Sequence, residues 1–262
     1  KKKYSLSILT SDDYTWAFDV WKRTIPKLQL NYQVTAINMV EDRLGYLTGW
    51  RISWWYLKTF GIFNTLKLTL FSVKKNLIFK FSKTRTWKEL SSKYGIKLFR
   101  FRNPNSVQAV EEITNQHPDI ILIMVGQVLK SPIIKIAKLG IVNKHGGILP
   151  SCRGLFPFFW GRINHLPVGV SFHLVNEKID AGELLAQKEI KSNSISMLGF
   201  YRLIYQQFPR LVDKALINLI EKKRLNPRSN LKSSYFGLPT RKDVKEFEGL
   251  GYSIAYWRDI LL

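Results

Sequence analysis

The apolar run Asp119–Val125 constrains the fold more than any other stretch of the chain. Its sequence, DIILIMV, shows no polar alternation, which is typical of a strand buried on both faces of a parallel sheet. Shorter runs of this kind recur along the chain, and helical patterns separate them. Further strands are expected at residues 4–10, 32–39, 96–100, 141–145, 168–175 and 184–190, the last two antiparallel to each other. We therefore predict an α/β fold, with a Rossmann-like, mostly parallel sheet and helices on both faces.

The chain after residue 190 has a different pattern. Apolar residues at helical spacing predict one or two helices over 194–224, followed by a polar linker, a small hairpin and a short helix near 241–248. We predict a catalytic domain over 1–192 and a C-terminal helical extension with the hairpin over 193–262. The first residues, Lys1-Lys2-Lys3 and the short strand behind them, are too polar for a signal peptide, so a cytoplasmic location is expected.

Positive charge is concentrated in one segment. The chain has 41 Lys and Arg against 19 Asp and Glu, a net charge of +22, and residues 43–88 contain basic but no acidic residues. Residues 46–81 within it are rich in aromatics, and no apolar run approaches the length of a membrane span. We favour amphipathic helices packed on the sheet, inserted at about 43–95. A helix lying in a membrane interface and a nucleic-acid surface stay open as alternatives.

Three polar residues stand out near predicted strand ends. Asn143 and His145 lie one residue apart at the end of a strand, so both side chains project from one face, and a Gly-Gly-Ile-Leu-Pro loop follows. Asp180 lies in a later turn. Each has an ordinary structural interpretation, but together they suit acyl transfer to an amine. Asn143 and a protonated His145 can stabilise an oxyanion, and Asp180 paired with the imidazole can help move the proton.

Competing chemistries have weaker support in the sequence. The histidines lack the spacing of a zinc motif, and Cys152, the single cysteine, has no base beside it in sequence. No glycine-rich dinucleotide fingerprint and no phosphate-binding loop is present. We therefore expect no metal, no thiol nucleophile and no dinucleotide.

The motifs resemble those of the 10-formyltetrahydrofolate-dependent formyltransferases. The matching residues are Asn143-Lys144-His145, Leu149-Pro150, Arg153-Gly154 and Ile179-Asp180-Ala181-Gly182, in the family's order and spacing. The resemblance implies the formyltransferase fold, 10-formyltetrahydrofolate as co-substrate, and Asn143, His145 and Asp180 as catalytic residues. It also implies that Arg153, Ser171 and His173 support the catalytic residues, although a packed strand histidine fits His173 equally well. The residues that it assigns to the folate pocket are Gly126, Gln127, Val128, Leu129, Ile148, Leu149, Pro150, Ile179 and Ala181.

The acceptor amine is less well determined. Gly146-Gly147 replaces the family's usual Ser-Leu, and the segment 43–95 has no counterpart in the family's minimal core. The segment Tyr235–Thr240 is similar to tails of enzymes that formylate nucleotide-linked amino sugars for surface polysaccharides such as lipopolysaccharide, and we favour that function. A methionyl-tRNA formyltransferase, a folate-dependent hydrolase and a non-catalytic basic binding module stay open. So do a homodimer and a peripheral membrane contact through 46–81, whereas nucleic acid is disfavoured as a partner.

Overall fold

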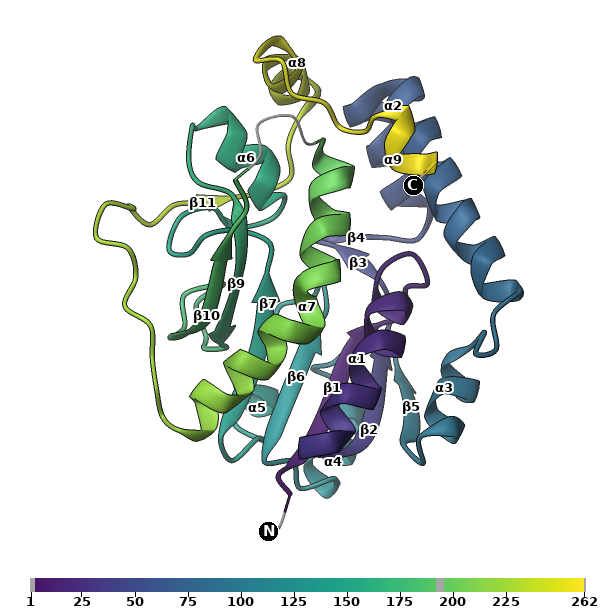
Figure 1. Cartoon of the computed structure of the whole chain (residues 1–262), viewed down its shortest axis with the longest axis vertical. Helices are drawn as coiled ribbons and strands as arrows, with labels where there is room; N and C mark the ends of the chain where they lie inside the picture. Colours follow the sequence, from purple (N-terminus) through teal and green to yellow (C-terminus); the bar gives the residue numbers. More distant parts are fainter. Residues whose placement is uncertain (1–2, 192–195, 262) are drawn as a thin grey trace.

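A seven-stranded, mostly parallel sheet forms the centre of the protein (Figure 1). The computed structural model describes residues 3–191 and 196–261. The strand order is β10-β9-β7-β6-β1-β2-β5, and β9 is antiparallel to both of its neighbours, β7 and β10. The strands of the sheet are β1 (Ser5–Ser11), β2 (Gln33–Val40), β5 (Lys97–Phe101), β6 (Ile120–Met124), β7 (Gly140–His145), β9 (Gly169–Leu174) and β10 (Leu184–Glu189). The predicted fold class is confirmed.

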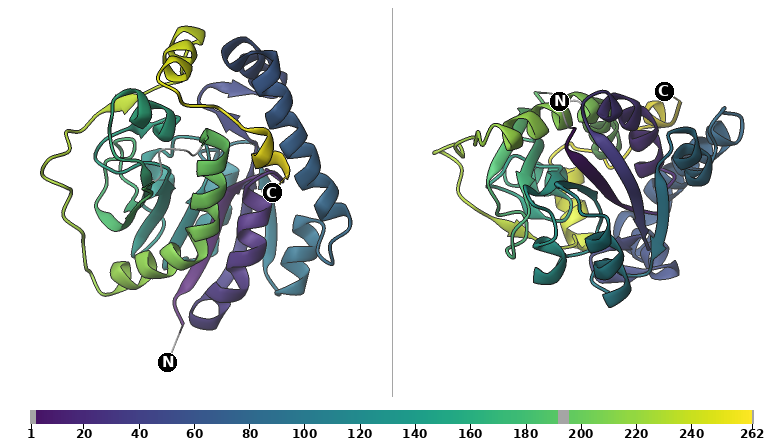
Figure 2. Two further views of the ribbon diagram at one scale, coloured as in Figure 1. Left: turned by 45° about the horizontal axis from the view of Figure 1, so that its top comes forward. Right: turned by 90° about the horizontal axis from the view of Figure 1, so that it is seen from below.

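Helices lie on both sides of this sheet, with α1 and α7 on one face and α4 and α5 on the other (Figures 1 and 2). The helices are α1 (Ala17–Asn31), α2 (Trp50–Lys80), α3 (Trp87–Lys93), α4 (Val107–Asn115), α5 (Ser131–Ile134), α6 (Pro157–Ile163), α7 (Met197–Ile220), α8 (Arg241–Gly249) and α9 (Trp257–Leu261). Several begin at a side chain that accepts backbone N–H groups, as Ser106 does for α4, Ser196 for α7 and Thr240 for α8. These polar residues therefore fix where the helices start.

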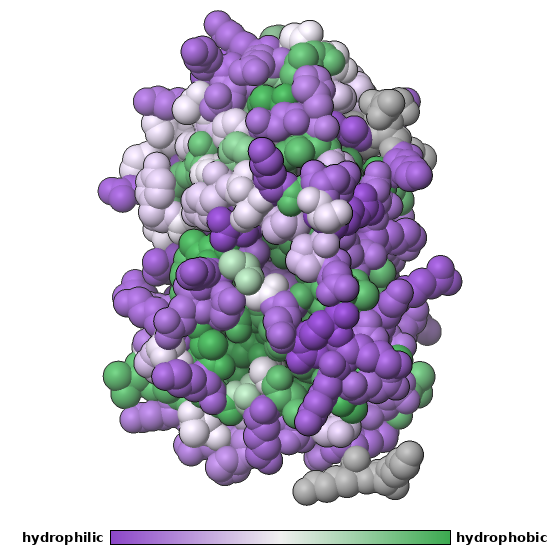
Figure 3. Space-filling model, turned by 90° about the vertical axis from the view of Figure 1, so that its left-hand side faces the viewer, coloured by the Kyte–Doolittle hydropathy of each residue, from purple (hydrophilic) through white to green (hydrophobic). Residues whose placement is uncertain are grey.

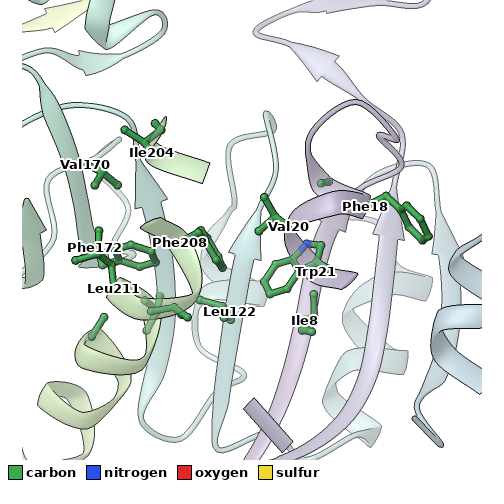
Figure 4. Packing of buried hydrophobic residues seen from close by; sticks show 14 of the residues in the cluster. Ile8, Phe18, Val20, Trp21, Leu122, Val170, Phe172, Ile204, Phe208 and Leu211 are labelled. Atoms are coloured by element: carbon green, nitrogen blue, oxygen red, sulfur yellow. The ribbon is translucent and has the colours of Figure 1, made fainter. Parts of the chain in front are cut away.

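Alternation along the strands divides the core into two clusters. Ile8 and Leu122 belong to the larger cluster, which includes α1 and α7, whereas Leu9 and Ile123 belong to a smaller one with residues of α4 and α5. Figure 4 shows Trp21 of α1 and Phe208 of α7 over the strands. The ring centroids of these two residues lie 5.4 Å apart. Residues of α7 are part of the larger cluster. The predicted domain boundary at residue 192 stays a prediction.

The basic aromatic segment forms a short hairpin and one long, kinked helix. The hairpin strands β3 (Arg43–Leu44) and β4 (Leu47–Thr48) lead into α2, whose helical backbone is interrupted at Gly61, where φ is +78°. The prediction of helices here is confirmed, but their expected position is wrong. Helix α2 packs mainly against α8, α9 and β4 rather than on the sheet, along the right side of Figure 1. None of the helices in the described ranges has the length and apolar content needed to cross a bilayer.

The prediction of a small hairpin in the C-terminal segment is wrong. Strand β11 (Tyr235–Phe236) instead pairs in parallel with β8 (Arg153–Gly154), so its backbone groups find partners in the loop after β7. The predicted start of the last long helix, Ser194, lies outside the described residues. From Met197 onward that segment is the single helix α7.

Candidate active site

The register of two antiparallel strands brings four polar side chains to one face of the sheet. Asn143 of β7 lies opposite His173 of β9, and His145 lies opposite Ser171. Residues directly opposite each other in an antiparallel pair project from the same face, as do residues two apart on one strand. The side chains of His145 and His173 are almost fully buried, with residue exposures of 5% and 2%.

Asp180 completes this cluster from the turn after β9. Its Oδ2 lies 3.3 Å from His145 Nδ1, and its Oδ1 lies 3.3 Å from both His173 Nε2 and Asn143 Nδ2. The backbone N–H of Gly154 donates to Oδ2 at 2.9 Å. Burial alone would raise the pKa of Asp180. His145, His173 and the Gly154 N–H lower it by more than burial raises it, so the pKa lies well below the usual range. Asp180 is therefore an anion at neutral pH.

The imidazole of His145 lies between two hydrogen-bond acceptors. Nδ1 faces the Asp180 carboxylate, and Nε2 lies 2.7 Å from the carbonyl oxygen of Cys152. Burial lowers the pKa of His145, and the Asp180 carboxylate opposes this effect. A neutral ring has one N–H and can donate to only one of these two acceptors. A ring that has taken up a second proton can donate to both. The arrangement allows His145 to take up and release a proton.

The structure brings Asn143, His145 and Asp180 together, as predicted, and adds His173 to them. His173 was expected to support these residues, and its Nε2 lies 3.2 Å from Asn143 Nδ2 as well as close to Asp180. Both groups predicted to bind an oxyanion, the Asn143 amide and His145, are engaged with partners inside the protein. Binding an oxyanion therefore requires that these hydrogen bonds be exchanged.

Ser171 supports the loop after β7 rather than the polar cluster. Its hydroxyl donates to Gly147 O at 2.6 Å, and accepts from Leu149 N at 3.1 Å and from Gln187 Nε2 at 2.9 Å. A Cβ on Gly147 would lie 2.9 Å from His145 Nε2 and 2.8 Å from Pro157 Cβ. Glycine at position 147 therefore lets the loop pass closely over the imidazole. The sequence alone gave no reason for Gly146-Gly147 in place of the family's usual Ser-Leu.

Arg153 also lies away from the polar cluster. Its backbone N–H and its Nε both donate to Ser234 O, beside the β8–β11 pairing. Its neighbour Gly154, which no motif assignment singled out for a role, is the residue that contacts Asp180. The predicted supporting role of Arg153 stays a prediction.

A cavity of about 330 Å³, here called the site cavity, opens beside the polar cluster. Asn143, His145, His173 and Asp180 line it, and so do five of the predicted folate-pocket residues, namely Gly126, Gln127, Val128, Leu129 and Ile179. The other four are not among its lining residues: Ile148 and Leu149 are buried in the protein, Pro150 is half-buried, and Ala181 is exposed. Their contact with folate stays a prediction. The volume lies in the usual range for ligand pockets.

A larger cavity of about 510 Å³, here called the second cavity, adjoins the first. Asn143 and Lys144 line both. Lys144 lies between the two predicted residues of β7, so its side chain projects from the opposite face, where its Nζ lies 4.3 Å from the ring centroid of Tyr205 in α7. Burial lowers the pKa of Lys144 to about 8, an effect that Asp180 partly opposes. The strand alternation could have placed this lysine, but nothing in the sequence marked the cavity.

Comparison with known proteins supports the family. Residues 79–196 match the family model described as formyl transferase. A methionyl-tRNA formyltransferase from Ligilactobacillus salivarius is 35% identical over 114 residues, 43% of this chain and 36% of that protein. The bifunctional polymyxin resistance protein ArnA of Wigglesworthia glossinidia brevipalpis is 38% identical over 106 residues, 40% of this chain and 16% of that protein. The resemblance predicted from the motifs is confirmed.

Solved structures share the fold at low sequence identity. A sugar N-formyltransferase from Shewanella has a TM-score of 0.55 and 18% identity, over 93% of this chain and 86% of that one. The N-formyltransferase of Helicobacter canadensis, solved with folinic acid and dTDP-3-aminofucose, has a TM-score of 0.55 and 16% identity, over 90% of this chain and 71% of that one. The matched part of this chain spans well under two thirds of the length of these two curated relatives.

Proposed function

We propose that the protein is an N-formyltransferase that moves a formyl group from 10-formyltetrahydrofolate to the primary amine of a nucleotide-linked amino sugar, for surface polysaccharide biosynthesis. One observation carries the proposal. The amide of Asn143, the imidazole of His145 and the carboxylate of Asp180 converge in the lining of the site cavity, and Asn143 also lines the adjoining second cavity. A donor in one cavity and an acceptor in the other would meet at these groups. The relatives and structural neighbours support this enzyme class and this co-substrate.

The residues of the site have complementary roles in this reaction. The acceptor amine, unprotonated, attacks the formyl carbon, and the negative charge that develops on the formyl oxygen needs donors. Asn143 Nδ2 and His145 supply them after exchanging their internal partners. Asp180, which stays ionised, holds the imidazole and favours its protonated form, and the proton passes from the amine towards the leaving folate nitrogen.

The lining of the second cavity suits a sugar. Hydroxyl groups are frequent in it, with Tyr56, Tyr201 and Tyr205 among the contributors. Within the described part of the chain, the Oγ1 of Thr65 and the Nε of Arg43 are buried here without a hydrogen-bond partner. Buried polar atoms without partners are rare, so these two would bind a polyhydroxylated ligand at a net gain. Arg43 and Lys144 also place positive charge where a phosphate group could bind.

A second candidate acceptor is methionyl-tRNA. It is favoured by the curated relatives, several of which are methionyl-tRNA formyltransferases, and by the net charge of +22, which would attract a polyanion. The two acceptors can be distinguished by direct assay.

The test is a screen of nucleotide-linked amino sugars and methionyl-tRNA with 10-formyltetrahydrofolate, followed by folate absorbance. We expect formyl transfer to an amino sugar, and loss of at least about a hundredfold in turnover in His145→Ala and Asp180→Asn. His165→Asn, at an exposed histidine that lines neither cavity, is the matched control. Transfer to methionyl-tRNA alone would replace the acceptor, and folate consumption without an acceptor would indicate a hydrolase. Folded His145→Ala with normal turnover would overturn the catalytic assignment.

A further inference from the structure

Helix α2 exposes a continuous apolar strip on the side away from the protein. Phe63, Leu66, Leu70, Val73 and Leu77 follow one another at spacings of three and four residues, so they lie on one helical face. Their exposed fractions run from 40% to 76%. The opposite face carries the buried residues Phe71 and Phe79. The strip therefore adds nothing to the core, although it consists of core-type residues.

Further exposed apolar residues lie before, after and beside this strip. Trp50 and Trp54 precede the kink and are 73% and 48% exposed, and Phe81 follows the helix at 88%. Trp257 of α9, 54% exposed, lies beside α2, with the Nζ of Lys67 5.6 Å from its ring centroid. Exposed apolar surface of this extent usually marks a binding site for another molecule. Figure 3 shows the side of the protein away from α2, where hydrophilic side chains cover most of the surface.

The charges around the strip indicate what it binds. Residues 43–88 contain no Asp or Glu, and six of their cations are exposed: Arg51, Lys58, Lys80, Lys83, Arg85 and Lys88. A second copy of the chain would bring the same cations against one another with no carboxylate in the segment to offset them. An anionic lipid surface offers both an apolar interior for the strip and negative headgroups for its flanking cations. Exposed tryptophan before and beside the strip suits the headgroup region.

We infer that α2 is an interfacial helix that docks the protein on an anionic membrane, with the strip from Phe63 to Leu77 inserted among the lipids. The docked orientation follows from the other face of the same helix. Thr65, Leu68 and Thr69 of α2 line the second cavity, so docking places that cavity close to the membrane surface. The inference rests on the exposed residues and charges of α2 and does not depend on the proposed reaction.

The test measures binding of the full chain to vesicles by flotation. We expect binding to vesicles of phosphatidylcholine and phosphatidylglycerol, weaker binding at higher salt, and little binding to phosphatidylcholine alone. The triple variant Phe63→Ser, Leu70→Ser and Leu77→Ser should bind at least about tenfold more weakly, because the apolar contribution is lost. None of these side chains lines either cavity, so formyl transfer and thermal unfolding should stay unchanged.

The matched control is the double variant Leu30→Ser and Val107→Ser, at two apolar side chains outside α2 that are each 73% exposed. It should bind like the unchanged chain. Equal binding by the strip variant and the control would mean that net charge alone attracts the protein, and the inference would fail. It would fail equally if no vesicle bound and sedimentation velocity showed a dimer that the strip variant dissociates.

Discussion

Replacing Gly154 with alanine is expected to disturb the candidate active site through the C-terminal segment. Gly154 adopts a φ of +91° in β8, and its N–H donates to Asp180 Oδ2 at 2.9 Å. An added Cβ would lie 2.2 Å from the carbonyl oxygen of Phe236 in β11, a separation that real Cβ atoms essentially never show. The pairing of β8 with β11 must therefore open, and the N–H must move relative to the carboxylate.

The magnitude follows from two contributions. A side chain in the left-handed region of φ costs about 1–2 kcal/mol, and weakening a hydrogen bond to a buried carboxylate costs about 1.5–3 kcal/mol. We therefore expect the free energy of unfolding to fall by about 2.5–5 kcal/mol. The pKa of Asp180 should rise, because one of the groups that lower it is displaced, and formyl transfer should weaken.

Urea unfolding and formyl-transfer kinetics of Gly154→Ala test this reasoning, with Gly237→Ala as the control. Gly237 lies in the same segment, but a Cβ there meets nothing within 4 Å and no positive φ is required. The control should unfold and react like the unchanged protein. If the two variants had equal stability and equal turnover, the proposed dependence of the site on the β8–β11 pairing would be refuted.

Three further predictions concern single side chains. Ser171→Ala should lower the free energy of unfolding by about 1–3 kcal/mol in urea, because three polar groups lose their shared partner. Asp180 has a depressed pKa when folded, so the stability that it contributes is present above its unfolded pKa of about 3.9 and is lost as the pH falls below it; urea unfolding at pH 7 and pH 3 should show the difference from Asp180→Asn shrinking. The pKa of Lys144 is also depressed in the folded protein, so its contribution to stability is full above its unfolded pKa of about 10.4 and becomes smaller as the pH falls towards 8. Urea unfolding measured from pH 10.5 to pH 8 should therefore show the unchanged protein losing stability relative to Lys144→Met.

The sequence predicted the parts of the site that depend on local order. Asn143 and His145 share a face because strand alternation is local, and the motif spacing placed Asp180 in the turn beyond β9. The direct contact of His173 with Asp180 was missed, because it depends on the register between β7 and β9, and a single sequence shows no register. The role of the Gly154 N–H was missed because backbone groups carry no signature in sequence.

Long-range pairings also escaped prediction. The partner of Tyr235–Phe236 lies some eighty residues earlier in the chain, and two residues are too short a strand for a pattern to identify. Helix α2 was predicted as a helix, but its position depends on α8 and α9, which come near the end of the chain. Helix α1 continues through Pro26 to Asn31, because its packing against the sheet outweighs the missing hydrogen bond at proline.

The strand order has a consequence for any attempt to isolate the segment that matches the family model. Residues 79–196 include β5, β6, β7, β9 and β10, but β1 and β2 lie between β6 and β5 in the sheet. Expressed alone, the segment would leave β5 without its neighbour and would turn the apolar strand Ile120–Met124 into an open edge, where it would pair with other chains. A minimal folded unit must therefore begin before β1. In this protein, the boundary of the match to the family model is not a boundary of folding.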